Sequence, residues 1–329
     1  MIPELASSSE RVLVTGATGQ IGSELIFDLR KRFGKDNVVA AGHSKAPTEA
    51  LQNSGPFEYL DTSDKSAIQK TVDQYGIDCI YHLAGILSAV GEKNPQLAWK
   101  VNMDSLRNVL EIAREKQIRQ VFWPSSIAVF GPETPRMNVP QETVLIPRTV
   151  YGITKVAGEL LCNYYHEKYG LDVRSLRYPG IISSETPPGG GTTDYAVEIF
   201  YEAIREKRYT CFVRKDTVLP MLYMPDCISA TIELMDAEAS TIAVRTSYNL
   251  GGLSFSAEDL ANEITKLIPD FVCSYEPDFR QKIADSWPRS VDDRKAREDW
   301  GWKPRYDLTS MTKDMIDKLS RRFEEQGLI

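Results

Sequence analysis

Short apolar runs alternate with longer amphipathic segments through the first half of the chain. The apolar runs end in small or turn-forming residues, and the segments between them have the length and periodicity of helices. The expected strands begin near residues 11, 37, 57, 78, 120 and 172, and the expected helices span residues 22–33, 64–75, 98–116 and 150–170. Nearly continuous apolar strands that are linked by helices are typical of a parallel sheet covered on both faces. The pattern therefore predicts an α/β fold with a doubly wound parallel sheet.

This regular pattern ends near residue 180. Residues 183–195 ("SSETPPGGGTTDY") contain too many helix- and strand-breaking residues to form a regular element, and the pattern after them is less periodic. We therefore expect a flexible lead at residues 1–10 and a Rossmann-type domain at residues 11–180. Residues 181–329 are expected to form mainly a smaller substrate-binding lobe, with segments that return to the first domain.

Composition narrows the class of ligand. The chain has 329 residues, of which 42% are hydrophobic, so it can bury a large core. Its formal net charge of -7 argues against a nucleic acid or an anionic membrane as partner, and no apolar run approaches the roughly 18 residues of a membrane span. The five cysteines and three histidines form no metal-binding or disulfide pattern. Small molecules are the expected ligands, without a metal, and no targeting peptide is evident in residues 1–10.

A glycine-rich loop follows the first expected strand. The stretch "VLVTGATGQIGSELI" places Gly16, Gly19 and Gly22 as GxxGxxG between a strand and a helix. Such glycines permit a tight turn, and the N–H groups at the start of the helix hold a pyrophosphate. A turn that serves packing alone is the alternative, but its place in the βα series favours dinucleotide binding. The spacing resembles that of the short-chain dehydrogenase/reductase superfamily, whose members lead us to expect NAD as cofactor.

The end of the second expected strand departs from this resemblance. NAD-using members carry an acidic residue there for the adenosine ribose, whereas this chain has Gly42, His43, Ser44 and Lys45. Ser44 could still hydrogen-bond a ribose hydroxyl. The two basic residues could attract the 2′-phosphate of NADP, or they could simply be solvated. By resemblance Asp61 contacts the adenine, although it or a neighbour could instead cap the next helix.

A second group of polar residues follows the fifth expected strand. Tyr151 and Lys155 form a YxxxK motif, and Ser126 precedes the tyrosine by 25 positions, as in the extended branch of the superfamily. Tyr164 and Lys168 repeat the motif, so the motif alone is weak support. Tyr164 lies on the apolar stripe of the helix, and we predict that it is a packing residue. Tyr151 and Lys155 lie on the opposite side, which favours a catalytic pair over an ordinary surface pair.

The expected chemistry is the oxidation of an alcohol. A free phenol titrates near ~10, but a lysine ammonium and a positively charged nicotinamide stabilise its phenolate. Tyr151 would then accept a hydroxyl proton, Ser126 would bind the substrate oxygen, and Lys155 would also hold the cofactor ribose.

Segments spread along the chain resemble the short-chain type of L-threonine 3-dehydrogenase. They are "LAGILSAVGEKNP", "PSSIAVFGP", "RYPGIIS", "GGGTTDYAVEIFYEAI" and "DSWPRSVDDRKAREDWGWKP", and the resemblance runs from about Arg11 to beyond Pro304. It implies NAD-dependent oxidation of L-threonine to 2-amino-3-oxobutanoate, the first step of threonine degradation toward glycine and acetyl-CoA. It also implies a set of site residues. The implied substrate contacts are Ser88, Ser126, Tyr151, Thr193 and Trp287. The implied cofactor contacts are Gly16, Gly19, Gln20, Ile21, Gly22, Ser44, Asp61, Thr62, Leu83, Ala84, Gly85, Asn102, Tyr151, Lys155 and Tyr178.

Some of these implied roles have plainer alternatives. Asn102 is expected to brace the end of the fourth strand, although it could be a solvent-facing helix residue. The loop around Thr193 could serve flexibility alone, and Trp287 could belong to the core.

The resemblance further implies partners and a compartment. We expect a homodimer that forms through the YxxxK helix and its predecessor, and functional coupling to a 2-amino-3-ketobutyrate CoA ligase. A eukaryotic protein of this kind would reside in the mitochondrial matrix and a bacterial one in the cytoplasm. Two other functions stay open: a nucleotide-sugar epimerase or dehydratase of the extended branch, and a non-catalytic NAD(P)-sensing protein.

Overall fold

The computed structural model describes residues 10–189 and 191–329, which fall into two compact units. Unit 1 contains the residues up to Ser125, Val156–Ser175 and Ala243–Ser247, and unit 2 contains Ser126–Lys155, Leu176–Ile242 and Tyr248–Ile329. The division of the chain near residue 180 stays a prediction. The flexible lead expected at residues 1–10 lies, except for residue 10, outside the described residues.

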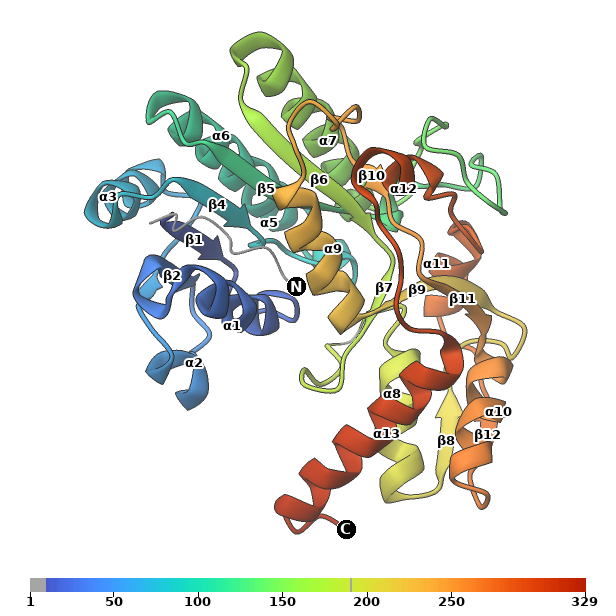
Figure 1. Cartoon of the computed structure of the whole chain (residues 1–329). Helices are drawn as coiled ribbons and strands as arrows, with labels where there is room; N and C mark the ends of the chain where they lie inside the picture. The colour runs from blue at the N-terminus through green and yellow to red at the C-terminus, as the bar shows by residue number, and fades with distance from the viewer. Residues whose placement is uncertain (1–9, 190) are drawn as a thin grey trace. The chain divides into compact units, whose positions relative to one another are not determined.

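A seven-stranded parallel sheet has the order β10-β6-β5-β4-β1-β2-β3 (Figure 1). The part from β3 to β6 follows the 3-2-1-4-5-6 order of the Rossmann fold. Every residue of β1, β2 and β4 is buried, which explains why their sequences are almost continuously apolar. The expected doubly wound Rossmann-type sheet is confirmed. Its strands are β1 (Val12–Thr15), β2 (Val38–Gly42), β3 (Phe57–Tyr59), β4 (Cys79–His82), β5 (Gln120–Ser126), β6 (Asp172–Tyr178) and β10 (Tyr248–Asn249).

Amphipathic helices cover the sheet in unit 1. Buried residues of α3, α6 and α7, among them Ile68, Leu106 and Cys162, pack with alternate strand residues such as Leu13 and Ile80 in one apolar cluster. The helices and helical turns are α1 (Gly22–Phe33), η1 (Lys35–Asn37), α2 (Glu49–Asn53), α3 (Lys65–Tyr75), α4 (Ser88–Lys93), α5 (Pro95–Trp99), the π-helical turn η2 (Lys100–Asp104), α6 (Ser105–Glu115) and α7 (Val150–Tyr169). The first residues of α7 belong to unit 2.

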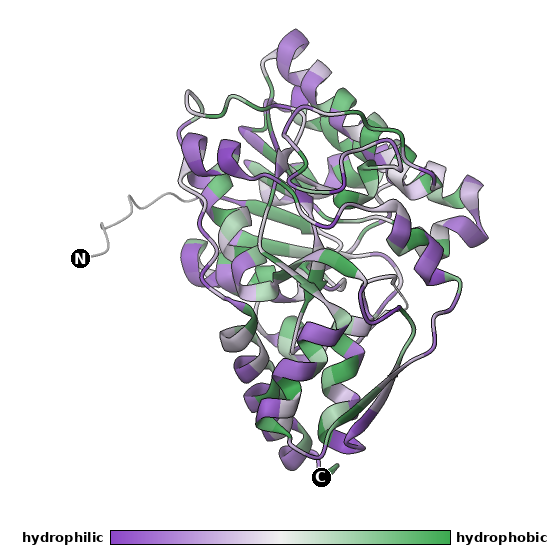
Figure 2. Ribbon diagram, turned by 90° about the vertical axis from the view of Figure 1, so that its right-hand side faces the viewer, coloured by the Kyte–Doolittle hydropathy of each residue, from purple (hydrophilic) through white to green (hydrophobic). Residues whose placement is uncertain are grey.

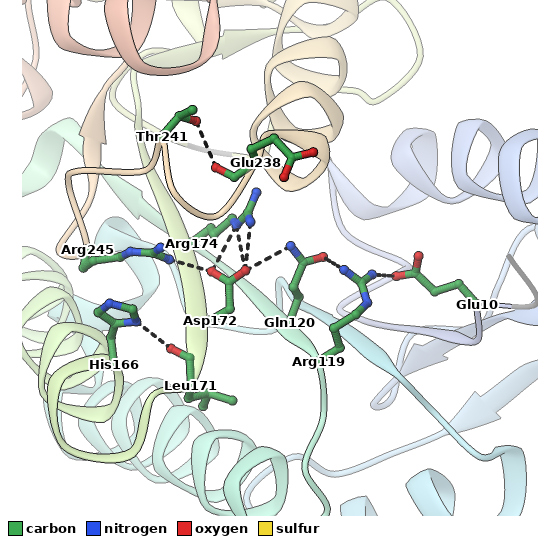
Figure 3. Close-up of polar contacts among 10 residues, drawn as sticks. All are labelled: Glu10, Arg119, Gln120, His166, Leu171, Asp172, Arg174, Glu238, Thr241 and Arg245. Carbon is green, nitrogen blue, oxygen red and sulfur yellow. Dashed lines mark hydrogen bonds and ion pairs between the residues drawn. The ribbon is translucent and has the colours of Figure 1, made fainter. Parts of the chain in front are cut away.

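A buried ionic network holds the amino ends of β5 and β6 in unit 1 (Figure 3). The Asp172 carboxylate accepts hydrogen bonds from Arg174 Nη2 at 2.8 Å, from Arg245 Nη1 at 2.5 Å and from Gln120 Nε2 at 3.1 Å. The Arg174 side chain is 1% exposed. Because Arg245 belongs to the segment Ala243–Ser247, this network anchors that segment to the strands.

Unit 2 contains two small sheets and all the described helices that begin after residue 176. One sheet has the order β11-β9-β7, with β11 antiparallel to β9, and the other pairs β12 with β8 in parallel. Figure 2 shows helices that combine hydrophilic and hydrophobic residues, as expected for helices with one buried face. No described helix is both long and apolar enough to cross a membrane. The elements are η3 (Ile127–Val129), β7 (Gly180–Ile182), α8 (Tyr195–Arg205), β8 (Arg208–Cys211), β9 (Val218–Tyr223), α9 (Met224–Asp236), β11 (Leu253–Ser256), α10 (Ala257–Leu267), β12 (Val272–Tyr275), α11 (Arg280–Ser286), α12 (Arg294–Trp300) and α13 (Leu308–Glu325).

Candidate functional site

The glycine loop of unit 1 is tight enough to require glycine at two of its three motif positions. Gly16 has φ +71°, and a Cβ there would lie 2.7 Å from the backbone nitrogen of Ala84. A Cβ at Gly22 would lie 2.4 Å from the Gly16 carbonyl oxygen. At Gly19 an added Cβ would meet only that same oxygen within 4 Å. Gly16 and Gly22 therefore allow close backbone packing. At Gly19 no other described part of the chain covers the loop, so its backbone is accessible to a ligand.

Helix α1 begins directly after this loop without a side-chain cap. Its N-cap residue is Ile21, which offers no hydrogen-bonding group to the first turn. The start of a helix carries partial positive charge and N–H groups that suit an anion such as a pyrophosphate. The open loop surface and the uncapped helix fit the pyrophosphate of a dinucleotide, so the predicted contacts at Gly19, Gln20 and Ile21 stand as proposals.

Asp61 and His43 meet at the carboxyl ends of β2 and β3. The Asp61 carboxylate accepts hydrogen bonds from Ser63 N at 2.9 Å and Ser63 Oγ at 2.8 Å, which lower the pKa of Asp61 below its usual range. His43 Nε2 lies 3.9 Å from Asp61 Oδ2. The N-cap of α3 is Asp64, so Asp61 does not cap this helix. The Asp61 carboxylate is therefore available for a ligand. Ser44 is exposed at the same end of the sheet.

The segment after β4 is braced by Asn102. Its Oδ1 accepts a hydrogen bond from Ile86 N at 2.7 Å, and its Nδ2 donates to Ile86 O at 3.1 Å. Its Oδ1 would lie 3.3 Å from a Cβ at Gly85. The sequence predicts one helix across residues 98–116, whereas Asn102 lies in the π-helical turn η2 between α5 and α6. Such turns often occur at functional sites because they redirect one side chain.

The other cofactor and substrate positions of unit 1 lie close to these elements. Leu83 N donates to the carbonyl oxygen of Thr15 at 3.1 Å, which joins the ends of β4 and β1. Thr62 is buried, and its carbonyl accepts a hydrogen bond from Asn108 at 3.3 Å. Ser88 is buried at the first position of α4. Their roles toward a ligand stay predictions.

In unit 2 the structure brings together Ser126, Tyr151 and Lys155. Ser126 ends β5, and its hydroxyl hydrogen-bonds the phenol of Tyr151. Lys155 Nζ lies 5.5 Å from the centre of the Tyr151 ring, and its side chain is largely buried. Desolvation by the surrounding protein raises the pKa of Tyr151 to about 12, and the Ser126 hydrogen bond acts in the opposite direction. This arrangement can transfer a proton once a further positive charge lies near the phenol.

The second YxxxK pair shows that our packing prediction for Tyr164 is wrong. Tyr164 is 45% exposed, and its hydroxyl accepts a hydrogen bond from Lys168 Nζ at 2.5 Å. Ile153 and Leu160 on the same predicted stripe are also exposed. Helical periodicity shows that these residues share a face of α7, but it cannot show that other parts of the same chain cover this face.

The remaining predicted residues of unit 2 lie in well-packed surroundings. The Thr193 side chain packs so closely on Gly180 that a Cβ at Gly180 would lie 2.7 Å from Thr193 Cγ2, which links "RYPGIIS" to "GGGTTDYA". The Tyr178 side chain is buried, and its hydroxyl hydrogen-bonds that of Thr231, so a contact with a cofactor would involve its backbone. Trp287 is buried after α11. Their roles toward substrate or cofactor stay predictions.

One buried contact escaped the sequence analysis. Ser125 Oγ donates to Glu159 Oε1 at 2.6 Å, and both side chains are almost completely buried. The bond joins the end of β5 to α7 in unit 1. Glu159 follows Lys155 by one helical turn, and this spacing could have drawn attention to Glu159. The sequence does not indicate its partner, because Ser125 lies 34 positions earlier in the chain.

The chain is similar to known proteins over most of its length. Residues 12–251 match the model of the NAD dependent epimerase/dehydratase family. An uncharacterized epimerase/dehydratase of Staphylococcus haemolyticus is 47% identical and covers 95% of this chain and 98% of its own length. The solved holo form of a GalE-like L-threonine dehydrogenase from Cupriavidus necator is 51% identical, with a TM-score of 0.92, and covers 94% of this chain and 99% of that one. A monomeric L-threonine 3-dehydrogenase from a metagenome is 48% identical, with a TM-score of 0.91 and the same coverage of the two chains.

These relatives confirm the resemblance to L-threonine 3-dehydrogenases along almost the whole chain. They also indicate an oxidoreductase that uses NAD(P). The chain therefore belongs to the NAD dependent epimerase/dehydratase family, the extended branch of the short-chain dehydrogenases/reductases.

Proposed function

We propose that this protein is an NAD-dependent L-threonine 3-dehydrogenase, which oxidises L-threonine to 2-amino-3-oxobutanoate. The observation that carries the proposal is the hydrogen bond between Ser126 and Tyr151 with Lys155 beside the ring, because this group suits the oxidation of a secondary alcohol. The choice of L-threonine is supported by relatives of that activity that are about half identical over nearly the full chain. The reaction would begin the degradation of threonine toward glycine and acetyl-CoA.

Three residues of unit 2 would carry out the proton transfer, each with a different role. Ser126 would hydrogen-bond the substrate oxygen and hold the alcohol next to the phenol of Tyr151. Tyr151 as a phenolate accepts the hydroxyl proton, and the Lys155 ammonium lowers the free energy of that phenolate. A bound oxidised nicotinamide would supply the acceptor for the hydride of the carbinol carbon and a positive charge near the phenol.

The cofactor would be held mainly by unit 1. The glycine loop from Gly16 to Gly22 would bind the pyrophosphate, and Ser44, Asp61 and Thr62 would bind the adenosine end. Leu83, Ala84 and Gly85, braced by Asn102, would present backbone to the cofactor. Within unit 2 we propose Tyr151, Lys155 and Tyr178 as cofactor contacts.

The substrate would be an amino acid with a secondary hydroxyl. Ser126 and Tyr151 would bind the hydroxyl, and we assign Ser88, Thr193 and Trp287 to the rest of L-threonine. Hydroxyl and backbone groups can bind both an ammonium and a carboxylate, so these residues suit a small zwitterion.

A homodimer that forms through α7 would cover the apolar face that the chain leaves exposed. Ile153, Leu160 and Tyr164 lie on one side of this helix, and each is 45–62% exposed. Exposed apolar residues that gather on one helix face favour a protein interface. Coupling to a 2-amino-3-ketobutyrate CoA ligase would remove the unstable oxo acid.

The experiment that tests the function compares substrates. Wild-type protein with NAD is offered L-threonine in one sample and UDP-galactose or UDP-glucose in another, and NADH is followed by its near-ultraviolet absorbance. We expect NADH formation with L-threonine and no conversion of the nucleotide sugars. Interconversion of the two sugars without reaction of L-threonine would instead establish an epimerase. Binding of NAD without either reaction would support a binding protein.

A further inference from the structure

A buried hydrogen bond in unit 1 joins the end of β5 to the middle of α7. Ser125 Oγ donates to Glu159 Oε1 at 2.6 Å, and the two residues are 2% and 1% exposed. The chain connects each of them directly to the proton-transfer group, which consists of Ser126, Tyr151 and Lys155. Ser126 is the next residue of β5, and Lys155 lies one turn before Glu159 on the same helix. The bond therefore joins the two elements at the points where they carry this group.

Helix α7 approaches β5 closely at the same place. A Cβ at Gly158, the residue before Glu159, would lie 2.3 Å from Cη2 of Trp123 and 3.1 Å from Cδ2 of Leu106. Trp123 and Ser125 are two positions apart on β5, so their side chains leave the strand on the same face. Leu106 and Trp123 belong to the apolar cluster of the core. Glu159 therefore places a carboxylate next to an apolar contact between α7 and β5.

Packing alone does not explain a carboxylate at this position. Burial of a charged or polar group costs free energy unless hydrogen bonds replace those with water, and an apolar side chain of similar size would avoid this cost. An apolar contact also tolerates small shifts of a helix along a strand, whereas a hydrogen bond weakens steeply when its geometry changes. A directional bond therefore suits a place where one register between the helix and the strand is required.

We propose that Glu159 and Ser125 are positioning residues for the proton-transfer group. Their bond holds the end of β5 in one register with α7, and it thereby maintains the alignment of Ser126 with Tyr151 on which the hydrogen bond between them depends. The inference rests on the role that the proposed function gives to Ser126 and Tyr151, but it does not depend on the identity of the substrate.

Variants that keep the side-chain volume test this inference without any turnover. Glu159→Met removes the acceptor at about the same volume, whereas Glu159→Gln retains an oxygen acceptor. In protein whose tyrosines carry carbon-13 at Cζ, the nuclear magnetic resonance signal of Tyr151 is identified by its absence in Tyr151→Phe. Its chemical shift at neutral pH reports the hydrogen bond from Ser126. We expect Glu159→Met to displace this signal in the same direction as Ser126→Ala, and Glu159→Gln to leave it near the wild-type position.

The rate of L-threonine oxidation should change together with this signal. Glu159→Met should lower kcat by about tenfold and change the dissociation constant of NAD by less than about threefold, because the proton transfer is misaligned. Glu159→Gln should recover most of kcat. Ser125→Ala should displace the signal and lower kcat in the same way, and it replaces Glu159→Met if that variant does not fold. The double change of Ser125 and Glu159 should cost no more than the larger single change, since both remove one bond.

Glu263→Met is the matched control. Glu263 is also a buried carboxylate that accepts a hydrogen bond, from Lys266, and it lies on α10, which carries none of the proposed site residues. This change should lower the midpoint of urea unfolding but leave the Tyr151 signal and kcat as in the wild type.

Three results would overturn the proposal. One is a Tyr151 signal that coincides in Glu159→Met and the wild type, and another is an equal displacement in the control. The third is an unchanged signal in Ser126→Ala, since the proposal requires the hydrogen bond between Ser126 and Tyr151. The expected displacements in a protein that forms no NADH from L-threonine would refute the proposed function and leave this inference standing.

Discussion

Two opposing effects act on the pKa of Tyr151, and desolvation is the larger one. Burial raises its pKa to about 12, and the hydrogen bond from Ser126 lowers it. Ser126→Ala should therefore raise the pKa of Tyr151 further and move the ascending limb of the kcat/KM profile to higher pH. Because the phenolate is the active form, kcat/KM near neutral pH should fall by about a hundredfold.

Ser126→Thr is the control for this prediction, because it retains the hydroxyl. It should restore most of the activity and the position of the ascending limb. A pH profile of Ser126→Ala that coincides with that of the wild type, apart from a lower plateau, would show that Ser126 has no influence on the Tyr151 titration.

Sequence reasoning predicted that Ser126, Tyr151 and Lys155 belong together, because their spacing and the place of Ser126 at the end of β5 can be read directly. It failed for Tyr164, since helical periodicity does not identify what covers a face. It missed Glu159 because a buried carboxylate is understood only with its partner, and Ser125 lies on another element.

The contact between α7 and β5 depends on a glycine. A Cβ at Gly158 would lie 2.3 Å from Cη2 of Trp123, whose ring is buried in β5. Gly158→Ala forces the helix or the ring to move, which costs about 1–3 kcal/mol, while the better helix propensity of alanine recovers up to about 1 kcal/mol. We expect a lower midpoint of urea unfolding.

The matched control is Gly189→Ala. No atom lies within 4 Å of an added Cβ at Gly189, so the midpoint should change little. Equal midpoints for Gly158→Ala and the wild type would show that α7 adjusts to the methyl group without cost.

The ionic network of Figure 3 stabilises the amino ends of β5 and β6. Burial raises the pKa of Asp172, but the hydrogen bonds and charge of Arg174 outweigh this effect, so the net pKa lies below its usual value. Asp172→Asn leaves Arg174 and Arg245 without their carboxylate and should reduce the free energy of unfolding at neutral pH by about 3 kcal/mol.

The sign of the pH dependence follows from the lowered pKa. The contribution of Asp172 is complete above its unfolded pKa, near ~3.9, and is lost as the pH falls through the lower folded value. The difference between wild type and Asp172→Asn should therefore shrink below about pH 4. Asp317→Asn removes an exposed ion pair on α13 and should cost less than about 1 kcal/mol at any pH. An equal loss in the two variants at neutral pH would contradict the special role of the network.

At the level of elements, the helix across residues 98–116 shows what periodicity cannot resolve. The apolar pattern predicts one helix, whereas the structure contains α5, the π-helical turn η2 and α6. A single π-helical turn changes the pattern too little to be seen in one sequence. The structure suggests a role for this turn, because Asn102 within it forms two hydrogen bonds with Ile86.

At the scale of the whole molecule, the α/β fold and its parallel sheet were predictable because each strand is short, apolar and followed by a helix. The division into two compact units could not be predicted, because the chain leaves unit 1 after Ser125 and re-enters it at Val156. Those exchanges depend on contacts between distant residues, which one sequence does not reveal.

The proposed homodimer can be tested at the exposed face of α7. If the protein is a homodimer through this helix, Leu160→Glu places a charge in the interface and should yield monomers in sedimentation velocity. The fold of the variant should stay intact, because Leu160 is 62% exposed in the single chain. A wild-type protein that sediments as a monomer, like the monomeric relative from a metagenome, would contradict the dimer.

The most direct test of the central claim is the initial rate of NADH formation from L-threonine and NAD by the wild type and by Tyr151→Phe. The account predicts a clear rate for the wild type and a loss of at least about a hundredfold in kcat for the variant, with NAD binding retained. Equal rates for the two proteins, or no NADH from L-threonine with the NAD-bound wild type, would contradict the account.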